Sequence, residues 1–550
     1  MRQLANRFRG VRASTQREGL ALLFFLSIYL LTVRGYYGGD HFLSYMTAES
    51  LALDRSLALS QRLSDVSEIR EQQQRRLVQP VLGHDGRPYS HYGIGLPLAM
   101  APFYLLGHTV SCAVPGLPHD LVTMFAVSCT NAVITALTCI TLAACARRLS
   151  YSARTAFGLA VLYGFGTMAW NYAQYSYAEP LLVLLSVSAL YYLCRYRQFA
   201  NKSWRSAAAS GIWAGLCLLT EVYSAAIIAI CFGVCVLWIA IERLSKDRCA
   251  LLAPIAYGAA TIPSVAFLIY FNLLRFGRAL PTDQRLVGDF SLAYIPVALY
   301  GFTLSTGKSL FLYCPALLVA LGGIRSFSSR HTHLAILIVA IAALSVIPIA
   351  TWINWWHGDL AWGPRFLFHL VPLLLLPATE ILEHRIWRRW PKLFMIAVLA
   401  LALIVQPASI LVNQGHYIAV VEDHGLGDTF FTPYLSPIVG HGLLIISTVG
   451  HWFTGHSLHI SYPGPAYRGL EGGVTVDFGP YEGFDLWFVN LAQRNPGPSV
   501  VYIAVIGVLT LLAVATGSSY SIWRSLGNRL VHPSDRADDT EERRCASPGG

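Results

Sequence analysis

The chain alternates between long apolar runs and short polar segments. Most of the runs are close to the roughly 20 residues that a helix needs to cross the hydrocarbon core of a bilayer. This pattern predicts an all-α, polytopic membrane protein. The predicted runs cover 20–36, 93–113, 120–146, 155–171, 180–197, 207–222, 223–241, 249–273, 306–324, 333–352, 366–383, 393–412 and 499–518.

Composition supports the membrane prediction. Of the 550 residues, 55% are hydrophobic and 13% are charged, whereas a soluble globular chain carries about 25% charged residues. The net charge of +10 would suggest a nucleic-acid partner in a soluble protein. Here the basic residues cluster in short loops between apolar runs, as in cytoplasmic loops, so we expect no nucleic-acid partner. The 11 cysteines form no CxxC pair and lie almost wholly in apolar runs, which indicates core residues.

The basic clusters also predict the topology. If all of them lie on the cytoplasmic side with the N-terminus, one apolar run cannot cross. The best candidate is 93–113, which Pro97 and Pro102 interrupt. We expect it to be a juxtamembrane or re-entrant helix, which leaves about twelve transmembrane helices. In the alternative, 93–113 crosses and Arg147 and Arg148 face outside.

This topology divides the chain into five parts. The first outer loop opens with Gly39 and Asp40, and the apolar positions that follow predict an amphipathic helix beginning near Phe42. The predicted parts are a cytoplasmic N-terminus (1–19), a transmembrane module (20–412) with the first outer loop (37–119), an outer region (413–498), a last transmembrane helix (499–518) and a cytoplasmic tail (519–550).

Charged residues are nearly absent from the middle of the predicted spans, which argues against ion or proton transport. The charges that need a reason lie at the outer surface. Asp40 follows the first span, where its carboxylate could accept a proton from an attacking hydroxyl. It could equally cap the helix that starts near Phe42.

Glu179 is a second carboxylate, in a short outer turn before Pro180. It could bind a substrate hydroxyl, an amine or a metal, or it could interact only with the dipole of the next helix. Tyr175 and Tyr177 in the same turn could stack on a sugar ring, although tyrosines at this depth are also ordinary interface anchors.

Arg365 begins a span at the outer surface, against the charge bias. Its guanidinium could bind a lipid phosphate through two hydrogen bonds, or it could snorkel to headgroups. Lys308, also at an outer helix end, is a second phosphate-binding candidate. His357 and Asp359 could be metal ligands, but their spacing is weak evidence.

Several of these segments together resemble one family. Gly39-Asp40 with the helix after it, Tyr175–Pro180 and Trp362–Arg365 are similar to motifs of the GT-C superfamily of membrane glycosyltransferases. The most similar relatives are protein O-mannosyltransferases and lipid A aminoarabinose transferases. Tyr89–Pro97 resembles a first-loop segment of these proteins, in which a lysine is expected where His91 stands. The resemblance covers about residues 20–410.

The resemblance implies a GT-C-like bundle in the bacterial inner membrane. It implies transfer of a sugar from a polyprenyl-phosphate donor to a lipid, glycan or protein acceptor on the outer face. Asp40 would be the base, Glu179 a second acid in the sugar site, and Arg365, with Lys308, would hold the departing phosphate. Some relatives use a divalent metal cation and others do not, and this sequence does not decide between them. The alternative is a lipid or solute transporter, which predicts inverted repeats and polar groups at the midplane; neither is evident.

Overall fold

The protein was analysed as a computed structural model, and the residues it describes fall in twelve segments. Asp40 and Asp359 lie outside them. The segments are 2–35, 41–60, 80–114, 117–198, 204–280, 290–353, 356–358, 361–384, 389–462, 474–479, 483–494 and 498–527.

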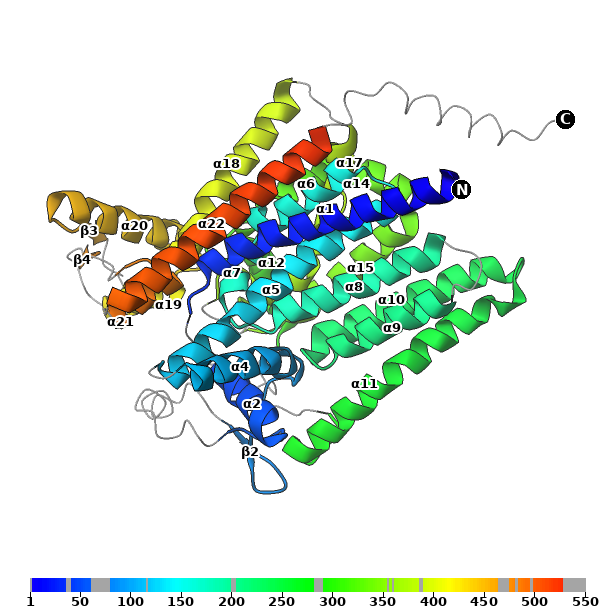
Figure 1. The fold of residues 1–550 in the computed structure, drawn as a ribbon, viewed down its shortest axis with the longest axis horizontal. Coiled ribbons are helices and arrows are strands. Elements are labelled where there is room, and N and C mark those ends of the chain that lie inside the picture. The colour runs from blue at the N-terminus through cyan, green and yellow to red at the C-terminus, as the bar shows by residue number, and fades with distance from the viewer. Residues whose placement is uncertain are drawn as a thin grey trace.

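Long, roughly aligned helices form the body of the molecule (Figure 1). This confirms the all-α prediction for the bundle. The long helices are α1 (Arg2–Thr32), α5 (His119–Arg148), α6 (Ala153–Gly166), α8 (Glu179–Gln198), α9 (Trp204–Cys217), α10 (Val222–Leu244), α11 (Leu252–Phe276), α14 (Leu317–Arg330), α15 (Thr332–Ala350), α18 (Arg389–Leu411) and α22 (Pro498–Gly527).

Eight helical stretches of the described chain are long and apolar enough to cross a membrane. The total of twelve spans stays a prediction, and so does the position of 93–113, because α4 (Gly95–Ala113) is one of the eight. The others are His119–Arg148, Val222–Leu244, Arg248–Phe276, Thr332–Ala350, Arg365–His384, Lys392–Leu411 and Val501–Leu526.

Prolines divide two of the predicted runs. Proline has no backbone N–H and disrupts the turn before it. The run 306–324 was predicted as one helix, which is wrong: α13 (Leu310–Tyr313) ends before Pro315, and α14 follows. The run 366–383 consists of η5 (Arg365–Leu370), α16 (Val371–Leu375) and α17 (Ala378–His384), with Pro377 between the last two.

The start of α1 and the end of α22 lie at one end of the bundle, which we call the terminal end (Figure 1). Basic turns gather there. Arg154 donates a hydrogen bond from Nε to the carbonyl of Leu526 (3.1 Å). Arg243 donates to the carbonyls of Tyr196 and Arg197 (3.1 and 2.7 Å). Several of the basic loops that the sequence assigns to one side of the membrane therefore come together.

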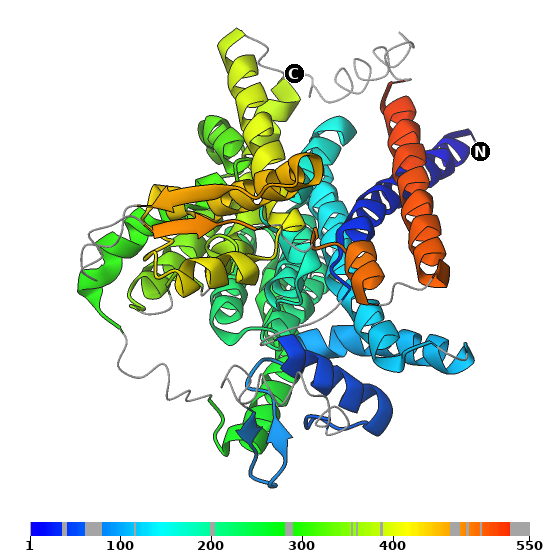
Figure 2. The same ribbon diagram turned by 90° about the vertical axis from the view of Figure 1, so that its left-hand side faces the viewer.

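The opposite end, which we call the site end, carries the segments between the long helices. Figure 2, seen from the left of Figure 1, shows α20 and the β3–β4 hairpin on one side of it and α2 and α4 on the other. The shorter elements are α2 (His41–Asp54), β1 (Val81–Leu82), β2 (Pro88–Tyr89), α7 (Ala169–Gln174), η2 (Arg248–Leu251), η4 (Leu292–Tyr294), α12 (Ile295–Thr303), α19 (Gln414–Asp423), η6 (Pro433–Leu435), α20 (Pro437–Thr454), β3 (His459–Tyr462), β4 (Val474–Asp477) and α21 (Trp487–Arg494). Both pairs, β1–β2 and β3–β4, are antiparallel.

Helix α2 is the helix that the sequence predicts after Asp40. It differs from the expectation in one respect: every side chain from Phe42 to Ser50 is buried, so in this stretch α2 has no solvent face. Because α4 packs against it, its polar groups need partners, and Tyr104 donates a hydrogen bond to Glu49 Oε1 (2.7 Å). Helices α2 and α4 thus pack on each other, and α4 packs against α5 of the bundle.

Candidate functional site

An ion pair between Glu179 and Arg365 joins the starts of two helical segments at the site end. Arg365 Nε donates to Glu179 Oε1 at 2.5 Å, and the two side chains are 16% and 8% exposed. Glu179 opens α8 and Arg365 opens η5. The second oxygen of the carboxylate, Oε2, is buried and has no hydrogen-bond partner among the residues that the structure describes. Burying an acceptor without a partner costs free energy, so this oxygen is a place for a ligand donor.

Two glycines explain why Arg365 reaches this position. Gly363 has φ +69°, a left-handed conformation that other residues rarely adopt, and a Cβ there would lie 2.5 Å from the sulfur of Met168. Gly358 has φ +73°, and its Cβ would lie 2.7 Å from Cβ of Arg365. The backbone before and beside Arg365 is therefore folded tightly around it.

Lys308 and His357 lie beside this segment. The ammonium of Lys308 donates to the carbonyls of Ala361 (2.8 Å) and Gly363 (3.2 Å), and the residue is 1% exposed. It lies 5.2 Å from the centre of the Phe430 ring, against which the ring of His357 stacks at 4.3 Å. These contacts make Lys308 a support for the loop that leads to Arg365. Its contact with a donor phosphate stays a prediction.

The two tyrosines of the Glu179 turn lie between two guanidinium groups. Arg365 lies 4.1 Å from the centre of the Tyr177 ring, and Arg34 lies 4.3 Å from that of Tyr175. The two rings are 5.3 Å apart and nearly parallel, at 8°. In this structure each ring forms a cation–π contact with an arginine side chain. Stacking on a sugar stays a prediction.

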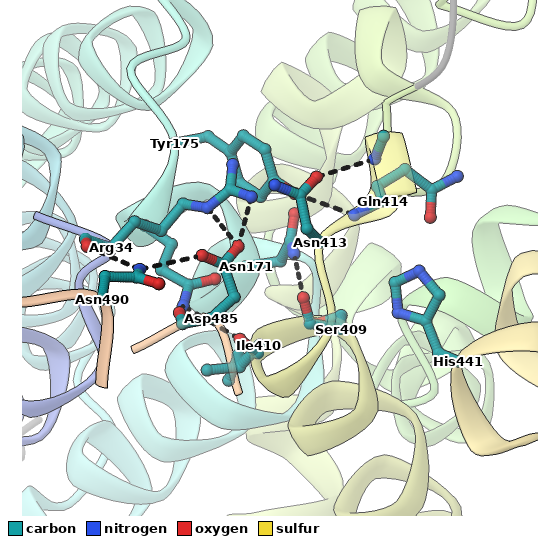
Figure 3. A network of polar contacts seen from close by, with 12 residues as sticks. Arg34, Asn171, Tyr175, Ser409, Ile410, Asn413, Gln414, His441, Asp485 and Asn490 are labelled. Carbon is teal, nitrogen blue, oxygen red and sulfur yellow. Dashed lines mark hydrogen bonds and ion pairs between the residues drawn. The ribbon is translucent and has the colours of Figure 1, made fainter. Parts of the chain in front are cut away.

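Arg34 belongs to a polar network that the sequence analysis did not identify (Figure 3). It forms a buried ion pair with Asp485. Asn490 Nδ2 donates to Asp485 Oδ1 (3.2 Å) and to the carbonyl of Arg34 (3.0 Å). Gln174 Nε2 donates to the carbonyls of Asp485 (3.1 Å) and Ile410 (3.0 Å). The region 413–498 thus contributes a carboxylate beside the site.

His91 and Glu221 complete the surroundings of the ion pair. His91 packs its ring against Tyr92 at 4.0 Å, and Tyr92 lies close enough to Arg365 for their charges to interact. Glu221, the N-cap of α10, interacts electrostatically with both Glu179 and Arg365. Burial raises the pKa of the Glu221 carboxyl, and the charge of Glu179 adds to the rise.

The structure therefore brings Glu179, Arg365, Tyr175 and Tyr177 into one contact group. His91 reaches this group through its neighbour Tyr92. Asp40 lies outside the described residues, and its role as base stays a prediction. In the described part of the chain, no group of three or more His, Cys, Asp or Glu residues could hold a metal ion.

Sequence comparison bears on what such a group does. Residues 84–279 match the family model described as dolichyl-phosphate-mannose-protein mannosyltransferase. This match confirms the resemblance to GT-C membrane glycosyltransferases. The matched segment contains Glu179, both tyrosines, His91 and Glu221, whereas Arg34, Lys308 and Arg365 lie outside it. No curated protein matches the sequence.

Solved structures were compared with the fold as well. ArnT from Cupriavidus metallidurans, in the apo state and bound to undecaprenyl phosphate, has a TM-score of 0.46 and 14% identity, covering 94% of this chain and 78% of that chain. The apo oligosaccharyltransferase of Archaeoglobus fulgidus has a TM-score of 0.40 and 13% identity, covering 73% of this chain and 57% of that chain.

Proposed function

We propose that this membrane protein transfers a sugar from a polyprenyl-phosphate donor to an acceptor hydroxyl or amine at the site end. The observation that carries the proposal is the Arg365–Glu179 pair. In this pair the terminal nitrogens of Arg365 can still bind a phosphate, and Oε2 of Glu179 can still accept a hydrogen bond from a hydroxyl. The name of the matched family, which states a dolichyl-phosphate-linked sugar and a glycosyl transfer, supports the donor class.

Arg365 can hold the phosphate while it stays paired with Glu179. A guanidinium has five N–H donors, and Glu179 accepts from Nε alone. In the described part of the chain, no hydrogen bond engages the two terminal nitrogens of Arg365. These two nitrogens can bind two phosphate oxygens side by side. Arg34, on the far side of the tyrosine pair, is itself paired with Asp485, so the phosphate-binding role falls to Arg365.

The reaction needs one bond to form and one to break. The acceptor oxygen or nitrogen attacks the anomeric carbon of the donor sugar, and the bond from that carbon to the phosphate oxygen breaks. The electron pair of this bond leaves with the polyprenyl phosphate, whose growing negative charge Arg365 stabilises. The proton of the attacking group passes to Asp40 in its predicted role as base.

Glu179 binds the substrate in this proposal. Its Oε2 is buried and unpartnered, so a hydroxyl or amine of the sugar or acceptor that donates to it gains a charge-assisted hydrogen bond. Burial raises the pKa of the nearby Glu221 carboxyl above its ordinary value.

The direct test is an activity assay on the full-length protein. Purified protein is incubated with radiolabelled polyprenyl-phosphate sugars and membrane extract. We expect label in an acceptor and release of unglycosylated polyprenyl phosphate, with both signals lost in Arg365→Ala. Movement of intact labelled donor across liposomes without release of polyprenyl phosphate would identify a transporter and overturn the proposal.

We propose that the site end faces outward. A cysteine-accessibility scan tests this: positions 84–92 and 420–490 should be labelled from outside, and 198–204 and 326–332 only after permeabilisation. Labelling of the 147–154 loop from outside would contradict the twelve-span topology.

A further inference from the structure

A cavity of about 310 Å³ lies at the terminal end, and residues of α1, α5, α6 and α22 line it. Its walls are apolar and mostly small, because six alanines line it together with Ile140, Phe157 and Ile522. None of the chemistry proposed for the site end uses it.

Three charged residues also line the cavity, and we call them its rim. Arg17 comes from α1, just before its apolar run, and Arg147 comes from the last turn of α5. Glu18 is the acid at the rim. The guanidinium of Arg154 donates to the carbonyl of Leu526 and so fixes the end of α22 beside the cavity. In the sequence, residues 1–17 contain five arginines and no acid.

Exposed aromatic residues mark the depth of the cavity. Tyr520 and Trp523 of α22, next to the lining residue Ile522, are 60% and 72% exposed. Large aromatic side chains that stay exposed at the end of a membrane helix are typical of the headgroup level. The rim arginines therefore lie where lipid phosphates lie, and the alanine walls lie on the acyl-chain side.

We propose that this cavity binds one anionic phospholipid. Its phosphate contacts Arg17 and Arg147, and the start of one acyl chain enters between the alanines. Basic pockets between transmembrane helices are sites for acidic headgroups, and guanidinium groups pair with phosphate through two hydrogen bonds. A free phosphate ion would leave the apolar walls uncovered, so the walls favour the lipid. The bound lipid ties the first and last long helices together.

The test measures lipid retention by the full-length protein in a zwitterionic detergent, using native mass spectrometry. The probes are dioleoylphosphatidylglycerol and dioleoylphosphatidylcholine. We expect selective retention of phosphatidylglycerol. We expect retention to fall about fivefold in Arg147→Gln and about 25-fold when Arg17→Gln is added, since each basic residue near an acidic lipid contributes about a fivefold factor.

The matched control is Arg325→Gln, an exposed arginine of α14 that does not line the cavity. It should retain phosphatidylglycerol as the wild type does. Glycerol 3-phosphate, which has the charged group without acyl chains, should not compete. Ala143→Phe, which fills the cavity, should lower retention with all rim charges in place. Equal retention of the two lipids, an equal loss in Arg325→Gln, or displacement by glycerol 3-phosphate would overturn the proposal.

Discussion

Two buried carboxylates, Glu380 at the terminal end and Glu179 at the site end, use their oxygens differently. Glu380 accepts from Tyr151 at Oε1 (2.5 Å) and from Ser326 at Oε2 (2.9 Å), and a histidine and an arginine also contact it. Glu179 accepts from Arg365 at Oε1, while its Oε2 has no partner. Both residues are nearly fully buried, at 2% and 6% exposure.

The comparison separates a structural acid from a candidate functional one. Buried polar groups in folded proteins are almost always paired, and an exception needs an explanation. Glu380 is satisfied within the chain, so it stabilises the contacts of α17 with α14 and with the turn before α6. Glu179 is satisfied only in part, so a ligand can complete its hydrogen bonds. Burial alone would not have distinguished the two.

The largest expected effect is that of Arg365→Ala. We expect kcat/KM to fall by about 10²–10³-fold, the loss for a group that stabilises charge in the transition state. Arg365→Lys keeps the charge without the planar fork and should retain part of the activity. Steady-state kinetics against donor concentration checks this. Equal, near-wild-type values for both variants would remove Arg365 from the site.

Removal of Arg365 also leaves Glu179 buried without its cation, which can destabilise the fold. The double variant Arg365→Ala/Glu179→Gln separates the two effects, because it removes both charges. Arg330→Ala is the matched control, since Arg330 lies 3.8 Å from Glu380 at the other end. It should leave kcat/KM near the wild-type value.

Asp40→Asn should lower turnover by about a hundredfold, because the amide cannot accept the proton that a general base takes. The melting temperature should stay near that of the wild type. If Asp40 only caps α2, asparagine caps equally well, and retained activity would show it.

Glu179→Gln and Glu380→Gln test the comparison itself. Glu179→Gln should reduce kcat/KM by about 10–100-fold, the value of a hydrogen bond to a charged group. Glu380→Gln should lower the free energy of unfolding by about 1–3 kcal/mol, because it disturbs a saturated set of donors. Its folded fraction should keep normal kinetics. An equal loss of kcat/KM in both variants would contradict the assignment of Glu179 as a functional acid and Glu380 as a structural one.

The smallest effect concerns Glu221 and pH. Its pKa in the folded protein is raised by burial, so the folded state binds the proton more tightly than the unfolded state. The resulting stability is present below the ordinary pKa of glutamate and is lost as pH rises through the raised value. The melting temperature of the wild type should therefore fall more over this range than that of Glu221→Gln. Parallel pH profiles for the two proteins would contradict the assignment.

The sequence predicted the positions of single helices better than the tertiary contacts between them. The runs 120–146 and 223–241 correspond to α5 and α10 within a few residues, because helix formation there depends on local apolar length. Glu179 and Arg365 were each identified from short motifs. Their pairing across 186 positions was not, since pairing depends on tertiary packing.

Arg34 and Asp485 differ in whether the sequence contains a pattern that points to them as site residues. Arg34 stands at the predicted outer end of the first span, against the charge bias, and the argument that identified Arg365 would have identified it too. Asp485 lies in 413–498, where neither hydrophobic periodicity nor a motif predicts α19 or the β3–β4 hairpin. Only the fold brings it to Arg34.

The Arg34–Asp485 pair also sets an order of events during synthesis. Its partners are 451 positions apart, and a ribosome adds about 5–20 residues each second. Arg34 therefore leaves the ribosome between about 20 and 90 s before its carboxylate exists. A nascent chain that has already inserted most of its helices still has an incomplete polar network. The segment that carries Asp485 therefore completes the network, and a chain released before Asp485 lacks it.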